Sequence, residues 1–274
     1  MSRYTKKAFT MLELVFVIVI LGIVASMSSE LIANVYKSYV LQKAQHNANL
    51  KTEIAVTQAS NRLQNALRFT VSRVKADGSL ESAYTISSTT GDEYVGIQWV
   101  GADYESYASA SKPGWSGFCD VNNSSQDTIS TPGSDLDFTN TVIDKLSNGT
   151  KGIADAVIYF RNDTNTTPNG VASSSSGEQI DLDSSTSFIS EHYKLAWTSY
   201  ALVVEDGDLY LYYNFPPTPN ANRNDGIKSL VLKNVTTFKM KVEGQTIRLK
   251  ICKQERISEN ADDNVTSCKE KAVF

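Results

Sequence analysis

Cysteine, histidine and proline are scarce in this 274-residue chain, which has three cysteines, two histidines and six prolines. Three cysteines are too few for a disulfide scaffold, and their wide spacing is not that of a structural zinc site. Neither His46 nor His192 has a second histidine or a cysteine at ligand spacing. The sequence therefore predicts no metal centre and no cofactor.

An excess of basic charge is also missing, because the formal net charge is -4. Proteins that bind nucleic acid usually have a basic face, so no direct nucleic-acid binding is indicated. The chain has no P-loop, no Gly-x-Gly-x-x-Gly and no Gly-x-Ser-x-Gly, and so none of these motifs supports a nucleotide-dependent or hydrolytic enzyme. The sequence favours a protein that is not an enzyme.

The N-terminus contains a basic segment followed by an apolar one. Arg3, Lys6 and Lys7 come first, and residues 9–29 contain no lysine or arginine and one carboxylate, Glu13. About 20 apolar residues are enough to cross a bilayer. Basic residues before such a span hold that end in the cytoplasm and send the rest of the chain outward. We therefore expect a single-pass membrane anchor.

Two conventional kinds of export segment fit this N-terminus incompletely. A secretory signal would be cleaved after the apolar run, where Ala25-Ser26-Met27-Ser28 matches the small-residue cleavage pattern only loosely. An uncleaved signal anchor fits the charge and the length, and would make the chain a surface binding protein or adhesin. It does not account for Glu13, because an ionisable group inside an apolar segment needs a partner.

The run Lys6-Lys7-Ala8-Phe9-Thr10-Met11-Leu12-Glu13-Leu14 resembles the processing site of type IV prepilins and type II secretion pseudopilins. The resemblance implies that a prepilin peptidase cuts between Ala8 and Phe9, and that Phe9 becomes the N-methylated terminus. Residues 1–8 would then be the leader, and residues 9–29 the transmembrane and assembly helix. Ala8 stands where the family usually has glycine.

The resemblance also implies a role for Glu13 in assembly. A carboxylate one helical turn from the new ammonium group of Phe9 can neutralise that group in its own subunit or in a neighbouring one. The alternative is that Glu13 has no role in assembly and is tolerated because it lies near the membrane interface. The implied partners are prepilin peptidase, other pilin or pseudopilin subunits and a bacterial inner membrane. The head would lie in the periplasm, and at the cell surface or in a fibre after assembly.

The segment after the anchor has the pattern of an amphipathic helix. Residues 30–75 contain no proline or glycine, and their apolar residues recur mostly at three- and four-residue steps. Asp77-Gly78 is a helix stop signal, so one helix is expected from about Phe9 to about Val74. We expect residues 30–76 to dock an apolar stripe on a globular head.

Residues 77–274 predict a β-rich head, because short runs of aromatic and β-branched residues alternate with turn clusters. Asp206-Gly207 between two such runs predicts a hairpin, and alternation on both sides of Glu243-Gly244 predicts a second. The expected fold class is α+β, with a long N-terminal helix packed on an antiparallel head. Strands and loops are expected as follows: strands at 94–100, 156–160, 196–204 and 209–215, and loops at 106–113, 124–134, 162–176 and 214–224.

Proximity along the chain predicts the disulfide pairing. Cys252 ends the last alternating run, and Cys268 follows it beyond an acidic segment. Outside the cytoplasm disulfides persist, and a bridge across this segment would contribute roughly 3 kcal/mol in the chain-entropy model. Cys119 would remain a free thiol.

Other residue groups suggest modification or ion binding more weakly. Asn122, Asn165 and Asn264 stand in Asn-x-Ser/Thr triplets with an aspartate two residues earlier. This resembles the extended acceptor site of some bacterial oligosaccharyltransferases, although a chain rich in these residues produces such matches by chance. The acidic runs at 181–184 and 260–264 could supply calcium ligands, but neither matches an EF-hand loop, and solvated loop carboxylates are the favoured interpretation.

The sequence thus indicates a structural subunit of a type IV pilus or a type II secretion-like fibre. The segment from Arg62 to Arg68 and the β-rich tail resemble the minor pseudopilins with larger heads. Fold and anchor are shared among secretion, DNA uptake and adhesion, so these uses stay open, and the uncleaved surface binding protein is the rival.

Overall fold

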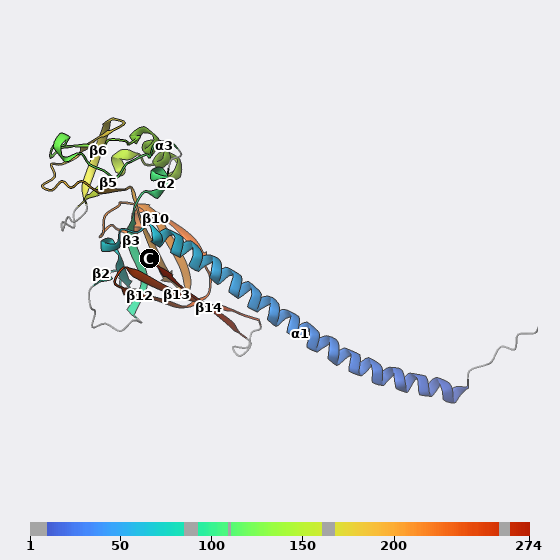
Figure 1. The fold of residues 1–274 in the computed structure, drawn as a ribbon. Coiled ribbons are helices and arrows are strands. Elements are labelled where there is room, and N and C mark those ends of the chain that lie inside the picture. The colour runs from blue at the N-terminus through green and yellow to red at the C-terminus, as the bar shows by residue number, and fades with distance from the viewer. Residues whose placement is uncertain (1–9, 85–92, 109–110, 161–167, 258–263) are drawn as a thin grey trace, which may run out of the picture. The chain divides into compact units, whose positions relative to one another are not determined.

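A long helix followed by antiparallel sheets makes up the computed structural model of the chain (Figure 1), which confirms the α+β class. Contacts divide the chain into two units, residues 1–48 with 255–266, and residues 49–254 with 267–274. The structure describes residues 10–84, 93–108, 111–160, 168–257 and 264–274.

Helix α1 (Met11–Gln64) is continuous, and it ends before the predicted end near Val74. The backbone N–H of Leu67 donates to the carbonyl oxygen of Val100 at 2.9 Å, so the chain joins a sheet here. Strand β1 (Ser72–Lys75) follows, with alternate residues buried. The prediction of helix over residues 30–76 is therefore wrong at its C-terminal end, because the last apolar residues also fit the two-residue alternation of a strand.

The described strands form three sheets, and every strand pair with a described register is antiparallel. The six-stranded sheet has the order β11-β10-β9-β3-β1-β2, and its further strands are β2 (Leu80–Ser82), β3 (Tyr94–Gly101), β9 (Thr198–Glu205), β10 (Asp208–Phe215) and β11 (Ile227–Leu232). The three-stranded sheet contains, in order, β12 (Val235–Glu243), β13 (Thr246–Glu255) and β14 (Val265–Val273). The five-stranded sheet has the order β4-β7-β6-β5-β8, with β4 (Thr128–Ser130), β5 (Val157–Phe160), β6 (Asn169–Ser176), β7 (Gln179–Leu182) and β8 (Tyr193–Ala196).

Short helices connect several of these strands. Among the described residues, two are α-helices and the others are single 3-10 turns: α2 (Tyr104–Tyr107), α3 (Leu136–Leu146), η1 (Arg68–Thr70), η3 (Val121–Asn123), η4 (Ile153–Asp155) and η5 (Arg223–Asp225). Aspartate side chains cap α2 and α3, where Asp103 accepts from the backbone N–H of Ser106 and Asp135 accepts from that of Phe138. Such caps satisfy backbone donors that the first helical turn leaves free.

The predicted hairpins are present. Asp206 and Gly207 both have positive φ, 52° and 80°, as the tight turn between β9 and β10 requires. The second hairpin, β12–β13, turns at Gly244 with φ 58°. Two predicted loops are partly wrong, because residues 124–134 contain β4 and residues 162–176 contain β6, which both pair with β7.

The head has two main hydrophobic cores. We call residues 49–101, 198–254 and 267–274 the large lobe, and residues 102–197 the small lobe. In the large lobe, the last turns of α1 pack between the six-stranded and the three-stranded sheet; the buried residues include Ala55, Ala59, Leu63, Trp99, Leu202, Leu211, Leu249 and Ile251. In the small lobe, α3 packs on the five-stranded sheet; the buried residues include Trp115, Ile129, Leu136, Ile143, Ile158, Ile180 and Leu195.

Candidate assembly site

Thr10 and Glu13 cap the first turn of α1. The backbone N–H of Glu13 donates to Oγ1 of Thr10 at 3.4 Å, and the backbone N–H of Thr10 donates to Oε2 of Glu13 at 3.4 Å. This reciprocal arrangement is a capping box, in which two free backbone donors find acceptors. The sequence interpretation above missed this role for Glu13, although the Thr-x-x-Glu spacing before an apolar run is its sequence signal.

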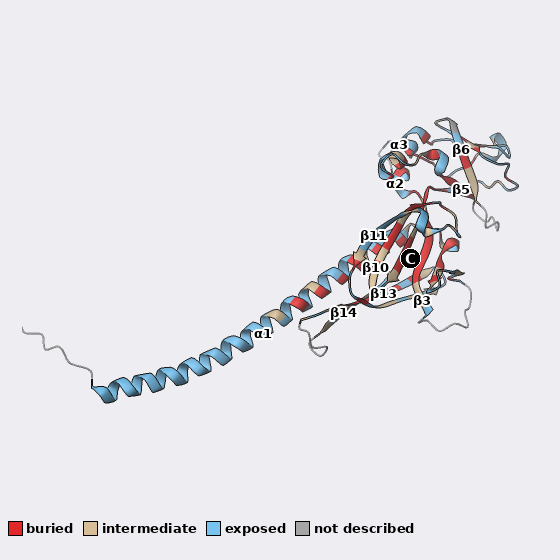
Figure 2. Cartoon of the chain, turned by 180° about the vertical axis from the view of Figure 1, so that it is seen from behind, coloured by how far each residue is buried: buried red, intermediate tan, exposed pale blue. Residues whose placement is uncertain are grey.

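The first part of α1 exposes an apolar surface on all sides. Large side chains from Met11 to Val24 are exposed along this stretch (Figure 2). The helix is the one element among the described residues that is long and apolar enough to cross a membrane. An exposed apolar surface of this size needs lipid or other proteins to cover it. The segment is therefore consistent with a single-pass anchor.

The predicted cleavage site, Ala8 and Phe9, lies outside the described residues. The first described residue is Thr10, which is the N-cap of α1. The apolar surface begins at once after this cap.

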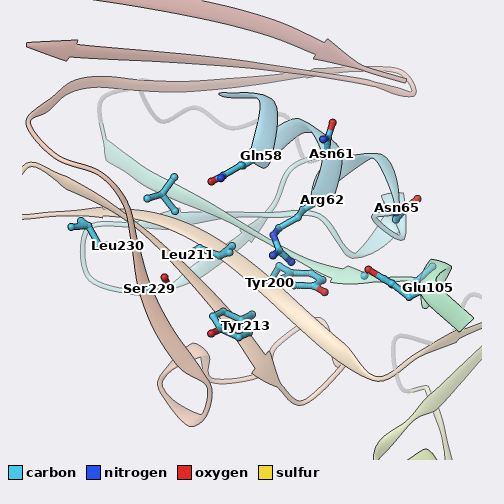
Figure 3. A pocket seen from close by; sticks show the side chains of 13 residues that line it. Gln58, Asn61, Arg62, Asn65, Glu105, Tyr200, Leu211, Tyr213, Ser229 and Leu230 are labelled. Atoms are coloured by element: carbon cyan, nitrogen blue, oxygen red, sulfur yellow. The ribbon is translucent and has the colours of Figure 1, made fainter. Parts of the chain in front are cut away.

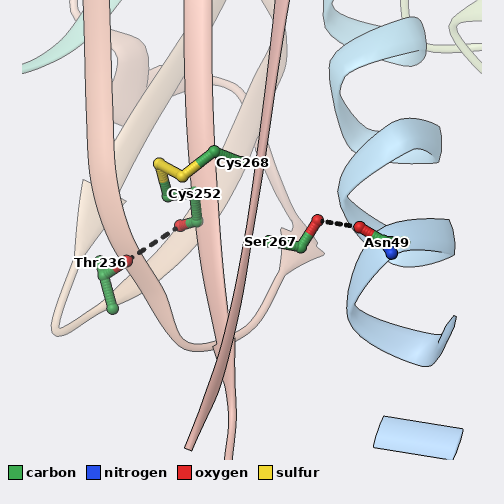
Figure 4. Close-up of a disulfide and its surroundings, with 5 residues drawn as sticks. All are labelled: Asn49, Thr236, Cys252, Ser267 and Cys268. Carbon is green, nitrogen blue, oxygen red and sulfur yellow. Dashed lines mark hydrogen bonds between the residues drawn. A yellow bond between two sulfur atoms is a disulfide. The ribbon is translucent and has the colours of Figure 1, made fainter. Parts of the chain in front are cut away.

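A disulfide joins Cys252 of β13 to Cys268 of β14 (Figure 4). This is the pairing that proximity along the chain predicts, and Cys252 is buried. Next to the disulfide, Oγ of Ser267 donates to Oδ1 of Asn49 on α1 at 2.6 Å. The bridge thus fixes the strand that contacts the helix.

An ion pair continues this contact between β14 and α1. Nζ of Lys269 lies 3.3 Å from Oε2 of Glu53. Both side chains are partly open to solvent, and exposed ion pairs of this kind contribute about 0–1 kcal/mol. The ion pair therefore adds little to what the disulfide and the pairing of β14 with β13 contribute.

Cys119, the remaining cysteine, is buried and unpaired in the small lobe. Its Sγ lies 3.4 Å from Oγ of Ser124. Burial raises the pKa of the Cys119 thiol, which lowers its reactivity because the thiolate is the reactive form.

The other residues singled out from the sequence are not brought into one site. Asn122 is exposed in η3, Asn264 is half-buried, and Asn165 lies outside the described residues. His46 and His192 are exposed on different elements. Within the described ranges, no cluster of three or more histidine, cysteine, aspartate or glutamate side chains could hold a metal ion.

Asp181 and its neighbours show the ordinary contacts of surface carboxylates. Oδ2 of Asp181 accepts from the hydroxyl of Ser173 at 3.0 Å, and Oδ1 accepts from that of Thr128 at 3.4 Å. These contacts fix the β4–β7–β6 edge. Most of the second acidic run, residues 260–263, lies outside the described residues.

Residues 3–29 match the family model of the prokaryotic N-terminal methylation motif. This motif, and the long apolar helix that follows it, support a type IV pilin-like protein. No curated protein and no solved structure matches the chain.

Proposed function

We propose that the chain is a minor pilin or pseudopilin, which a prepilin peptidase trims and which then joins a fibre through α1. The observation that carries the proposal is the methylation motif at residues 3–29, which includes the stretch of α1 whose surface is apolar all round and exposed. Before assembly lipid would cover that surface. After assembly the corresponding helices of other subunits would cover it.

Glu13 supports this proposal because two positive groups compete for its carboxylate. In the isolated chain it caps the backbone donors of its own helix. Cleavage after Ala8 adds an ammonium group to the same helix end, and a neighbouring subunit in a fibre adds a second. A carboxylate in an apolar environment is stabilised most by such a full charge, so cleavage and assembly both offer Glu13 a charged partner that the uncleaved chain lacks.

The proposed role is structural and not catalytic, with the head in the periplasm or at the cell surface. The basic residues before α1 support this orientation, and the Cys252–Cys268 disulfide suits an oxidising compartment. The rival is a signal-anchored surface binding protein that is not cleaved. It would keep the same head and the same orientation.

N-terminal peptide mass spectrometry separates the two functions. The full chain is expressed in a bacterial host with and without a prepilin peptidase. We expect an N-methylated terminus at Phe9 with the peptidase, and the Ala8→Gly variant serves as a control that restores the usual family residue. A chain that begins at Met1 in the presence of the peptidase, or near Ser28, would contradict the proposal.

A further inference from the structure

An aromatic cleft of about 1080 Å³ lies in the head and is lined by residues of both lobes. Its ring-bearing residues come from six separate segments of the chain: Phe69, Tyr104 with Tyr107, Trp115 with Phe118, Tyr159 with Phe160, His192 with Tyr193, and Phe274. Aromatic residues are only 9% of the chain, so this concentration marks the cleft as a site and not as ordinary surface.

Hydrogen bonds at their polar ends hold the inner rings of the aromatic cleft. Nε1 of Trp115 donates to the carbonyl oxygen of Asp103 at 2.8 Å. The hydroxyl of Tyr159 donates to the carbonyl oxygen of Pro217 at 2.7 Å. Because these rings are anchored, they form a rigid wall that loses little conformational entropy when a ligand binds.

The outer rings of the aromatic cleft are open to solvent. Phe69, Tyr104, Tyr107 and Phe118 are 59%, 54%, 45% and 42% exposed. Three of them stand next to a further ring, with centroid distances of 4.9 Å for Tyr107 and Trp115, 5.5 Å for Phe69 and Tyr159, and 6.4 Å for Phe118 and His192. Exposed rings on a fixed aromatic wall offer flat surfaces on which a ligand can stack.

A second hollow, of about 690 Å³, adjoins the aromatic cleft (Figure 3). Three residues with amide side chains, Gln58, Asn61 and Asn65, line its helix side. On its sheet side the guanidinium of Arg62 lies 5.1 Å from the ring centre of Tyr200. We call it the amide hollow.

The two hollows share Asn65 and Ala102 in their linings. Helix α2 stands at this junction, because Tyr104 lines the aromatic cleft and Glu105 lines the amide hollow. An elongated ligand could therefore contact stacking rings at one end and hydrogen-bonding amides at the other.

We propose that this double groove binds a neutral linear polysaccharide of β-1,4-linked pyranose units. A pyranose ring has an apolar C–H face that stacks on aromatic rings, and a polar edge of hydroxyl or acetamido groups. Amide side chains offer both donors and acceptors to such an edge. An extended chain of these units repeats both features along its length, which matches rings in one hollow and amides in the next.

The few charges in the groove favour a neutral ligand. The charged side chains in the two linings are Arg62, Arg68, Lys194 and Glu105. A single-stranded nucleic acid needs a basic groove that follows its phosphates, and these four charges are too few and of mixed sign. The ring surfaces, and not the cations, therefore set the specificity.

A peptide ligand is disfavoured because the outer edge of β8, at the aromatic cleft, is already partly paired. Strand β8 pairs with β5 on one side. On the other side, the backbone N–H of Tyr193 donates to the carbonyl oxygen of Gly117 at 3.1 Å, and Phe118 bridges to His192. Strand addition, in which a peptide pairs with an exposed strand edge, is therefore hindered at this end of β8.

Isothermal titration of the full-length chain with cellohexaose and chitohexaose tests the proposal. The chain is kept in a detergent without a sugar headgroup, which would otherwise compete. We expect one or both hexasaccharides to bind, and Tyr104→Ala to weaken binding roughly tenfold, because truncation of one aromatic anchor commonly has an effect of this size. Tyr104→Phe, which keeps the ring, should bind nearly as well as the wild type.

Two further variants separate binding from folding. Asn61→Ala removes an amide at an exposed helix position, where alanine favours the helix, so it should weaken binding without lowering the unfolding temperature. Phe138→Ala removes an exposed ring on α3 outside both hollows and should bind as the wild type does. Binding of neither hexasaccharide, wild-type affinity of Tyr104→Ala, or tighter binding of hexathymidylate that Tyr104→Ala abolishes would overturn the proposal.

Discussion

The hydroxyl of Thr10 lies 3.3 Å from Oε2 of Glu13, and the two residues cap each other's backbone at the start of α1. The arrangement gives Glu13 two separable properties, a hydrogen-bonding oxygen and a negative charge. Glutamine at the same position keeps the first and loses the second, because capping boxes accept either residue.

We predict that Glu13→Gln lowers incorporation into fibres severalfold while the head folds normally, because the lost charge can no longer pair with an N-terminal ammonium group. Thr10→Ala, which loses the cap hydroxyl at a cost of about 1 kcal/mol but keeps the charge, should retain more incorporation. Immunoblots of sheared fibres measure this, with N-terminal mass confirming that both variants are cleaved. Wild-type incorporation of Glu13→Gln would show that the charge is not used.

The Cys252–Cys268 disulfide should be the main constraint on β14. Its loop has a sequence separation of 16, for which the chain-entropy model gives roughly 3 kcal/mol. We predict that Cys252→Ser with Cys268→Ser lowers the unfolding temperature of the head by at least several degrees. The same change should increase proteolysis of β14, because only its pairing with β13 and its contacts with Asn49 and Glu53 then hold the strand.

Alkylation of the non-reduced chain is the matching control. Buried Cys119 should be labelled only after unfolding, and Cys252 and Cys268 only after reduction. A cross-link that includes Cys119, or three reactive thiols, would contradict the assignment.

Asp103 should make the stability of the head depend on pH. Burial raises the pKa of its carboxyl from 3.8 to about 6, although the carboxyl also accepts hydrogen bonds from Ser106. The folded chain therefore binds this proton more tightly than the unfolded chain does. Asp103 therefore contributes fully to the free energy of unfolding below about pH 4. This contribution falls as the pH rises to about 6, and above that pH the free energy of unfolding is lower by roughly 3 kcal/mol.

Asparagine is also a good N-cap, so Asp103→Asn should remove this pH dependence. We expect the variant to be more stable than the wild type at pH 7 and similar to it at pH 4, as measured by thermal unfolding. Asp120→Asn is a control of opposite sign, because a hydrogen bond from Asn123 lowers the pKa of the Asp120 carboxyl. It should destabilise the head at pH 7. Equal pH profiles for Asp103→Asn and the wild type would argue against an effect of burial.

The features that could be predicted from sequence are those that local chemistry decides. The anchor follows from the composition of residues 9–29, the first hairpin from Asp206-Gly207, and the disulfide from the short distance along the chain between its cysteines. The end of α1 could not be placed, because the apolar spacing up to Val74 fits both a helix and a strand. Pairing with β3, a tertiary contact, decides between them.

The candidate sites also differ in whether local sequence could predict them. The capping box at Thr10 is a sequence signal of four residues and was open to prediction. The aromatic cleft was not, because its rings come from positions as distant as Phe69 and Phe274. Only the packing of the two lobes brings such residues to one surface.

The last prediction concerns the two faces of α1 inside the head. Leu63 is fully buried in the large-lobe core, whereas Ile54, also on α1, is half exposed. Truncation of a buried leucine to alanine leaves a cavity and costs about 2–5 kcal/mol. The same truncation at an exposed helical position costs little, because alanine has the higher helix propensity.

We therefore expect Leu63→Ala to shift the midpoint of urea unfolding strongly to lower concentration, and Ile54→Ala to leave it nearly unchanged. Fluorescence of the full chain can follow both, because Trp99 is buried in the same core as Leu63. If the unfolding midpoints fell equally in the two variants, the last turns of α1 would not contact the core of the large lobe through one face only. Such a result would contradict the packing of α1 between the two sheets, because only a one-sided contact makes the two positions differ.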